Sequence, residues 1–528
     1  MESSLQLLFA SSLAMVASAV LFVMGRLVFS WYILPYLAYR QLMSNGFSGP
    51  KPSFPLGNLN DMKKKKKDDK IDYSISPSTS SSCKIFNDIH STVFPYFFEW
   101  QKLFGKVFVY WLGTEPFLYI ADPEFLKNMS ADIKGKSWGK PRVFKHDREP
   151  MFGNGLIMVE GEDWVRHRHN ITPAFTPGNL KAMAGLMVES ANSMLDRWVA
   201  LIDSGHPEIN AETEIIVTAG EIISRTSFGV SYENGREVLE KLRDVQIALF
   251  KSIRHVGVPY GKLLNPKLTQ KSKKLGREID ALLLSIITER RNQPRDGQPE
   301  TDLLGLLMAC NTTEGRPKGA LTTKELVDEC KTFFFGGHET TALSLTWTLF
   351  QLALHPEWQD QLREEIREVI GDAKNIVATM LVGLKKMGWV MNEVLRLYPS
   401  APNVQRQSRQ DIRVGELLIP KGTNMWIDLV SMHHDQNLWG ESVNEFKPER
   451  FKDDPIYGGC NHKMGYLPFG FGGRMCIGRN LSAMEYKIVL TLILSKFSFS
   501  LSKNYIHSPS IMLSLRPMHG LPLVFRKL

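Results

Sequence analysis

The chain has 528 residues, 43% hydrophobic and 23% charged, a composition that excludes wholesale disorder and predicts a globular protein with a sizeable core. Its formal net charge is +9, part of it in the run Lys63–Lys67. No recognition motif accompanies that run, so we expect no nucleic acid as a partner, and the remaining charge suits an anionic membrane or an acidic protein. The five cysteines are too few and too scattered for a disulfide framework or a zinc site.

The amino-terminal segment is apolar for about twenty residues, from Leu5 to Met24, which is long enough to cross a membrane. A cleaved signal peptide is the alternative, but its apolar region would be shorter and its basic residues would come first. Here Glu2 precedes the apolar run, and Arg26 and Arg40 follow it. We therefore expect residues 1–34 to be a transmembrane anchor with its interface segment, and the bulk of the chain to be cytosolic.

Three further segments follow the anchor. Residues 35–62 include GPKP, which forbids helix, and we interpret this segment as a hinge. Residues 63–82 are rich in Lys, Asp and Ser and predict a polar low-complexity insertion. Residues 83–528 then form one large domain.

Within this domain, helical periodicity dominates and strands are few. Two runs between residues 107 and 123 predict a hairpin, and short strand-like runs recur near residues 411–430 and at the carboxyl end. Thr322 and Glu325 form a capping box before a pattern that continues without proline to His355. The predicted fold class is mostly α with small β-sheets.

One loop, FGFGGRMCIG from Phe469 to Gly478, has a composition suited to a metal-bound thiolate. Its glycines allow close approach and unusual dihedral angles, and backbone N–H groups can shield the sulfur of Cys476. The alternative is a buried cysteine in an ordinary glycine-rich turn.

This loop fits the F-x-x-G-x-R-x-C-x-G signature of the cytochrome P-450 family, and it resembles that family with all five fixed positions in register: Phe469, Gly472, Arg474, Cys476 and Gly478. The resemblance extends over almost the whole chain. It implies the cytochrome P-450 fold, haem b as cofactor, and Cys476 as the axial ligand of the haem iron.

Other motifs of the family follow in the same order. Glu393 and Arg396 match E-x-x-R, and Arg450 resembles the third member of a structural triad. The resemblance assigns four residues to contacts with the haem propionates, namely Trp164, Arg168, Arg406 and Arg474. The alternative for these is an ordinary surface or core position.

The segment GGHETT lies inside the long predicted helix, where its paired glycines weaken regular helix. In the family, the matching acid and threonine, here Glu339 and Thr340, relay protons during dioxygen activation. The alternative is a helix kink in which the threonine hydroxyl bonds a carbonyl one turn back.

The resemblance implies a monooxygenase at the endoplasmic reticulum membrane, crossing it once. No flavin or nicotinamide fingerprint is evident in the chain, so electrons are expected from NADPH through a separate NADPH-cytochrome reductase. Two alternatives stay open: a haem-thiolate isomerase or dehydratase of the same family, and a haem-binding sensor or scaffold.

The segments HETT, NLWGESVNEFKPERF and KFSFSLSKNY resemble the plant branch with cytokinin hydroxylases, gibberellin oxidases, brassinosteroid-inactivating enzymes and triterpenoid oxidases. We therefore expect a lipophilic plant hormone or terpenoid as substrate. The candidates for its pocket by family position are Phe334, Phe335, Val404 and Met512.

A basic cluster in the loop before this pocket raises a further hypothesis. Its members are Arg142, Lys145, His146 and Arg148. Such a cluster could bind a substrate carboxylate, and an ordinary solvated surface is the alternative. The sequence fixes neither the substrate nor the carbon that is oxidised.

Overall fold

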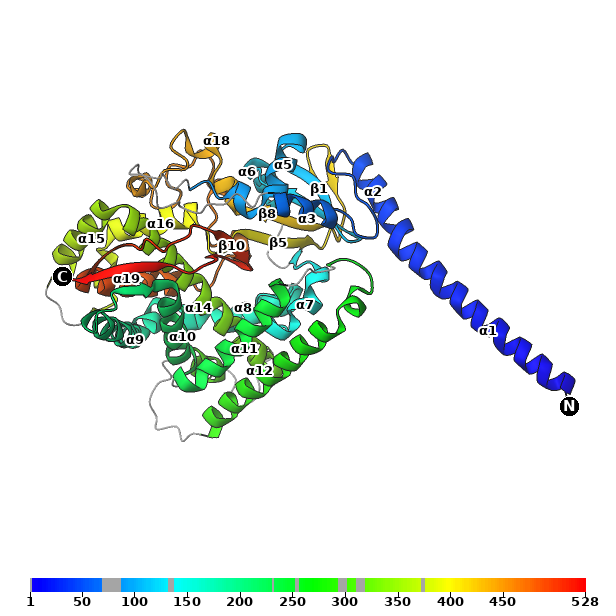
Figure 1. Cartoon of the computed structure of the whole chain (residues 1–528), viewed down its shortest axis with the longest axis horizontal. Helices are drawn as coiled ribbons and strands as arrows, with labels where there is room; N and C mark the ends of the chain where they lie inside the picture. Colours follow the sequence, from blue (N-terminus) through cyan, green and yellow to red (C-terminus); the bar gives the residue numbers. More distant parts are fainter. Residues whose placement is uncertain are drawn as a thin grey trace.

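Helices form most of the computed structural model of the chain, and small sheets lie beside and between them (Figure 1). The structure describes residues 2–68, 87–131, 137–229, 232–251, 256–292, 302–309, 319–371 and 376–528. The predicted class, mostly α with small β-sheets, is confirmed.

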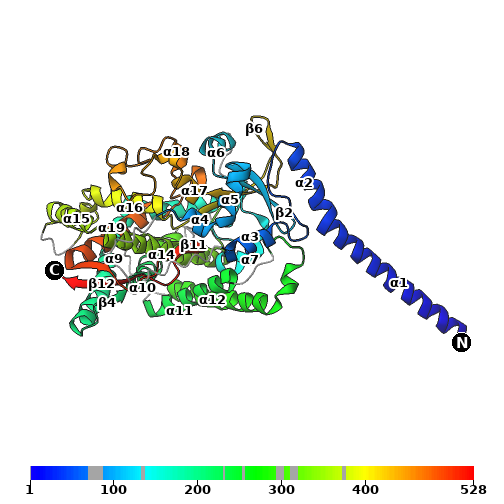
Figure 2. The same cartoon turned by 45° about the horizontal axis from the view of Figure 1, so that its top comes forward.

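The amino-terminal helix projects from the rest of the molecule in both views (Figures 1 and 2). Helix α1 (Glu2–Val28) continues through a π-helical turn, η1 (Phe29–Ile33), into α2 (Leu34–Ser44). The helical segment Phe9–Ser44 is long and apolar enough to span a membrane. It contains an 18-residue window with a mean hydropathy of 2.0, and no part of that window is buried within the molecule. Exposed apolar side chains of this kind favour a lipid environment over water.

The junction between anchor and globule differs from the predicted hinge of residues 35–62. Helix α2 continues to Ser44, because its end packs against the globule: Leu42 is buried, and the Asn45 side chain donates to the Leu418 carbonyl at 3.0 Å. Helix α3 (Leu59–Asp68) also enters the predicted polar insertion, whose remainder from residue 69 lies outside the described residues.

The largest sheet begins with the predicted hairpin, which is confirmed as β1 (Val107–Leu112) and β2 (Glu115–Ile120). Strands β8 (Asn424–Asp428), β5 (Asn403–Ser408) and β3 (Trp138–Gly139) extend it in the order β1-β2-β8-β5-β3. Among the described strands of this sheet, β2 and β8 pair in parallel and the other neighbours pair antiparallel. Stacked aromatic rings, such as Phe108 on Tyr119 at 4.5 Å, fix this sheet within the core.

Helix α14 (Thr323–Leu354) runs through the molecule, and its 32 residues span about 48 Å. The predicted capping box is confirmed: the Glu325 N–H donates to the Thr322 hydroxyl at 3.2 Å, and the Thr322 N–H donates to the Glu325 carboxylate at 2.7 Å. Helices α10 (Ala211–Phe228), α16 (Lys385–Leu397) and α19 (Arg479–Lys496) pack on different sides of α14, which explains why it is buried almost throughout.

Shorter elements complete the fold. The other described α-helices are α4 (His90–Val93), α5 (Pro95–Phe104), α6 (Pro123–Ser130), α7 (Arg142–Phe152), α8 (Gly161–Ile171), α9 (Pro177–Asp203), α11 (Tyr232–Lys251), α12 (Pro266–Asn292), α13 (Leu303–Ala309), α15 (Pro356–Val369), α17 (Leu429–His433) and α18 (Gln436–Trp439). The other described strands are β4 (Glu208–Asn210), β6 (Ile412–Val414), β7 (Leu417–Ile419), β9 (Phe497–Leu501), β10 (Pro509–Met512), β11 (Ser514–Pro517) and β12 (Pro522–Lys527). The strands predicted near residues 411–430 and at the carboxyl end are thereby confirmed.

Two truncations test where the anchor ends. Deleting residues 2–34 removes mainly exposed helix, so we expect a protein that leaves the membrane fraction with an unchanged Tm. Deleting residues 2–44 also removes the buried Leu42, which should lower stability by about 2 kcal/mol or more and the Tm by several degrees. Scanning fluorimetry of both proteins checks this, and equal Tm values would contradict the packed junction.

Candidate active site

The cysteine loop follows α18 and directly precedes α19, and it turns through η8 (Gly472–Arg474). The Cys476 N–H donates to the Phe469 carbonyl at 2.9 Å, which closes the loop. Gly470 and Gly472 have φ angles of +74° and +64°, a region that disfavours other residues. These glycines are therefore required by backbone conformation.

Cys476 is exposed and lines a cavity, so it is accessible to a molecule bound there. Burial raises the pKa of the Cys476 thiol, while the Gly478 N–H and the Arg168 guanidinium act to lower it. A bound metal cation would replace the thiol proton outright. The loop thus presents a sulfur with N–H and cationic neighbours that stabilise a thiolate.

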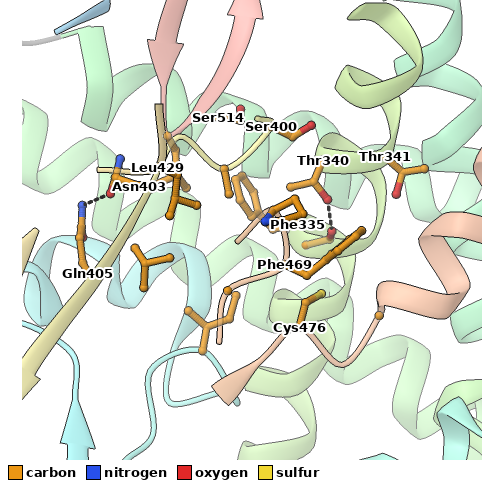
Figure 3. A pocket seen from close by; sticks show the side chains of 18 of the residues that line it. Phe335, Thr340, Thr341, Ser400, Asn403, Gln405, Leu429, Phe469, Cys476 and Ser514 are labelled. Atoms are coloured by element: carbon orange, nitrogen blue, oxygen red, sulfur yellow. Dashed lines mark hydrogen bonds between the residues drawn. The ribbon is translucent and has the colours of Figure 1, made fainter. Parts of the chain in front are cut away.

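The cavity has a volume of about 790 Å³ and is bounded by the cysteine loop, α14, α7, β5 and the β10–β11 hairpin. Figure 3 shows Cys476 and Phe469 on one side, with Thr340 and Phe335 of α14 nearby and Asn403 and Gln405 of β5 at another side. Segments that are far apart in the sequence therefore line one cavity.

The paired glycines of α14 serve two different purposes. A Cβ atom on Gly337 would lie 2.3 Å from Ile223 of α10, so this glycine permits close helix packing. Gly336 lines the cavity and has open space where a side chain would be. The Thr340 hydroxyl donates to the Gly336 carbonyl at 3.0 Å, which is the bond expected in the alternative interpretation of this segment.

Glu339 does not line the cavity, whereas its neighbour Thr340 does. The Glu339 carboxylate accepts hydrogen bonds from Arg516 at 2.9 Å, from Gln246 at 2.8 and 3.0 Å, and from Ser514. Adjacent side chains on a helix point about 100° apart, so Glu339 and Thr340 point to different sides of α14. The sequence offers no spacing signal for Arg516 or Gln246 as partners of Glu339.

The four residues assigned to the propionates all line the cavity. Arg474 lies over the Trp164 ring at 4.7 Å, and Arg168 donates to the Met475 carbonyl at 3.2 Å. Burial lowers the pKa of Arg474 to about 10, and burial with the charge of Arg474 lowers that of Arg406 to about 9. These lowered pKa values mean that burial makes the charged form of both arginines less favourable than it is in water.

Two more cations, Lys140 and Arg148, also line the cavity. Arg148 belongs to the basic cluster identified in the sequence, whereas no sequence pattern indicates Lys140. Burial, together with the charges of Arg406 and Arg148, holds the pKa of Lys140 well below its usual value. Among the described residues that line the cavity there is no Asp or Glu. The residues present fit a haem, because cationic side chains suit its propionates and a cysteine sulfur is a ligand that haem iron accepts.

The structure brings the predicted triad together in the core. Arg396 makes two bonds of 2.8 Å to Glu393, and Arg450 approaches the same carboxylate at 3.4 Å. Arg396 also donates to the His433 and Val443 carbonyls at 2.9 and 2.7 Å. This pair is fully buried and richly hydrogen-bonded, as such a pair must be.

The predicted substrate contacts are corrected at two positions. Phe335 and Val404 line the cavity, but Phe334 and Met512 do not. Phe334 points to another side of α14 and stacks on Phe228 at 4.0 Å. Met512 ends β10 and does not line the cavity, although Ile511 and Leu513 on either side of it do. Its carbonyl accepts a hydrogen bond from the Gln246 side chain at 2.7 Å.

Comparison with known proteins agrees with this geometry. Residues 85–519 match the family model described as Cytochrome P450. The chain belongs to the cytochrome P450 family. Membership implies a haem iron and makes the chain a monooxygenase of this family.

Several plant relatives of this cytochrome P450 match over nearly their full length. Two Arabidopsis thaliana proteins named Cytokinin hydroxylase are 35% and 36% identical, each over 98% of both chains. Cytochrome P450 714C2 of Oryza sativa subsp. japonica is 35% identical over 94% of both chains.

Removing the acid of the buried pair tests its structural importance. Glu393→Gln leaves Arg396 without a counter-charge in the core, so we expect a loss of about 3–5 kcal/mol in the free energy of unfolding. Glu416→Gln, on an exposed turn, is the control and should change stability by less than about 0.5 kcal/mol. Urea denaturation measures both; equal effects would contradict the triad's role.

Proposed function

We propose that this chain hydroxylates a lipophilic plant small molecule, using dioxygen and electrons passed from NADPH through a separate reductase. The observation that carries the proposal is that Cys476 and Thr340 line the same cavity. When bound, the haem supplies dioxygen activation and C–H hydroxylation, chemistry that no side chain provides.

The residues of the chain hold the cofactor and exclude water. Cys476 would supply the thiolate that holds the haem iron, and Trp164, Arg168, Arg406 and Arg474 would bind the propionates. Apolar side chains such as Phe335 and Val404 surround the substrate position and keep bulk water out.

Proton delivery is assigned to Glu339 and Thr340. Thr340 reaches the cavity, where its hydroxyl can hold a proton-carrying water. Glu339 lies beside it in sequence but is held by Arg516. Proton transfer from this carboxylate therefore requires its side chain to leave the Arg516 contact and turn toward the cavity.

We further propose a single-pass protein of the endoplasmic reticulum with a cytosolic catalytic domain. The apolar span and the basic residues Arg26 and Arg40 support this orientation. An NADPH-cytochrome reductase on the same membrane would dock near the face of the cysteine loop.

The substrate class follows from the relatives and the cavity together. A cavity of about 790 Å³ with mostly apolar walls suits a hormone or terpenoid, of the gibberellin, cytokinin, brassinosteroid or triterpenoid kind.

The presence of both Glu339 and Thr340 favours a monooxygenase that activates dioxygen over an isomerase or dehydratase. The decisive assay reconstitutes the chain with reductase and NADPH and screens these classes, with product identification; turnover also excludes a mere sensor or scaffold.

Replacing the sulfur ligand tests the centre of the proposal. The carbon monoxide difference spectrum of the reduced protein should show the thiolate-type band, and Cys476→His should abolish that band because imidazole is a weaker electron donor. Cys460→Ser, at a cysteine that does not line the cavity, should leave it unchanged. A thiolate-type band that survived Cys476→His would overturn the ligand assignment.

A second substitution tests proton delivery. Thr340→Ala should lower product per NADPH by roughly tenfold and raise hydrogen peroxide in proportion, because proton supply is impaired. Thr346→Ala removes a hydroxyl with the same bond to a carbonyl one turn back, but away from the cavity, and should keep coupling normal. Unchanged peroxide yield in Thr340→Ala would remove Thr340 from the relay.

A further inference from the structure

A tyrosine and a histidine that share a hydrogen bond lie close to one wall of the cavity. The Tyr505 hydroxyl oxygen and the His507 Nδ1 atom are 2.9 Å apart, in the segment between β9 and β10. Tyr505 is buried, and Ser508, the residue after His507, lines the cavity. The pair therefore borders the part of the molecule in which a haem and its substrate would react.

The hydrogen bond between these two side chains has a defined direction. His507 Nε2 is buried and has no partner in the described part of the chain. If Nδ1 carried the ring proton, both the Tyr505 O–H and the Nε2 lone pair would stay unpaired, whereas a proton on Nε2 leaves only that N–H unpaired. Burial also lowers the pKa of His507 to about 4, so its ring is neutral at pH 7. Tyr505 therefore donates to Nδ1, and this nitrogen can take up the phenol proton.

Further aromatic rings connect this pair with α14. The His507 ring stacks on Phe350 with 5.1 Å between ring centroids, and it meets the edge of Trp347 at 6.2 Å. Trp347 in turn stacks on Tyr398 at 4.3 Å. Trp347 and Tyr398 are both fully buried, so water does not separate these rings.

Trp347 and Tyr398 lie directly behind residues of the cavity wall. Ser344, about one helical turn before Trp347 on α14, lines the cavity. Ser400, which follows Tyr398 closely in the chain, also lines it (Figure 3). The aromatic rings thus form a continuous row from the cavity wall to Tyr505.

These residue types suit transfer of a single electron. Tyrosine and tryptophan lose an electron more readily than most side chains, and short steps between rings favour electron transfer. Oxidation of a phenol also releases its proton, so a base within hydrogen-bond distance makes the oxidation easier. None of these residues is among those assigned above to haem binding or proton delivery.

We propose that Trp347, Tyr398 and the Tyr505–His507 pair form a redox site that reduces an oxidised haem when no substrate is available. The inference rests on the haem chemistry of the proposed function and adds a protective activity to it. One electron passes from Tyr505 through the neighbouring rings to a haem that a peroxide has oxidised. The phenol proton moves to His507 Nδ1, so a neutral tyrosyl radical remains beside an imidazolium ion.

Freeze-quench electron paramagnetic resonance of the haem-loaded full chain tests this inference. The ferric protein is mixed with peracetic acid in the absence of substrate. We expect a tyrosyl radical, identified by a narrower signal when ring-deuterated tyrosine is incorporated. Tyr505→Phe should remove this signal and make the haem bleach several-fold faster. Tyr110→Phe, at a buried tyrosine of β1, is the matched control and should change neither.

Two further variants test the proton acceptor and the path of the electron. His507→Leu keeps Tyr505 but removes its base, so the radical should form roughly tenfold more slowly. Trp347→Phe keeps an aromatic ring but removes the readily oxidised indole, and it should lower the yield of the tyrosyl radical. An unchanged carbon monoxide difference spectrum shows that the haem site is intact in each variant.

Two outcomes would overturn the inference: a radical signal and bleaching rate in Tyr505→Phe equal to those of the unmodified protein, or a rate of radical formation that His507→Leu leaves unchanged. Failure of the proposed function gives a different result. In that case the chain forms no hydroxylated product with reductase and NADPH, while peracetic acid still generates the tyrosyl radical at Tyr505.

Discussion

The ion pair between Glu393 and Arg396 fixes the irregular part of the chain on which the active site depends. From α17 to the cysteine loop, the backbone has only short helical turns and little regular hydrogen bonding of its own. Arg396 fixes this segment, because its guanidinium donates hydrogen bonds to the carbonyls of His433, Val443 and Glu445. The Glu393 carboxylate balances the charge of Arg396. The segment that leads to Cys476 is thus held in place by the buried Glu393–Arg396 pair on α16.

The second organising element is α14, which divides its polar residues between two environments. Thr340 faces the cavity, and Glu339 enters a buried cluster that includes Arg516 from β11 and Gln246 from α11. The carboxylate therefore links three elements that surround the substrate space. Movement of α11 would alter the hydrogen bonds of the group that is proposed to supply protons.

Charge distribution connects several segments of the chain to the proposed cofactor. The cations that line the cavity come from α7, α8, β5, the cysteine loop and the segment before α7. A cation is costly to hold in the interior unless opposite charge or hydrogen-bond acceptors lie near it. The propionates of a haem would supply negative charge to Arg168, Arg406 and Arg474.

The sequence by itself determined the family, the mostly helical class, the cysteine loop and the capped helix α14, because these features are carried by local patterns: a contiguous signature, a capping box and hydrophobic periodicity. It also placed an apolar helix at the amino end, but not its continuation to Ser44, which depends on the packing of Leu42 against the globule.

Only the tertiary structure decided which side of α14 and β10 meets the cavity. It therefore excluded Phe334 and Met512 from the wall and turned Glu339 toward Arg516. It also selected Arg148 from a basic cluster and added Lys140, because burial and the direction of a side chain depend on elements distant in sequence.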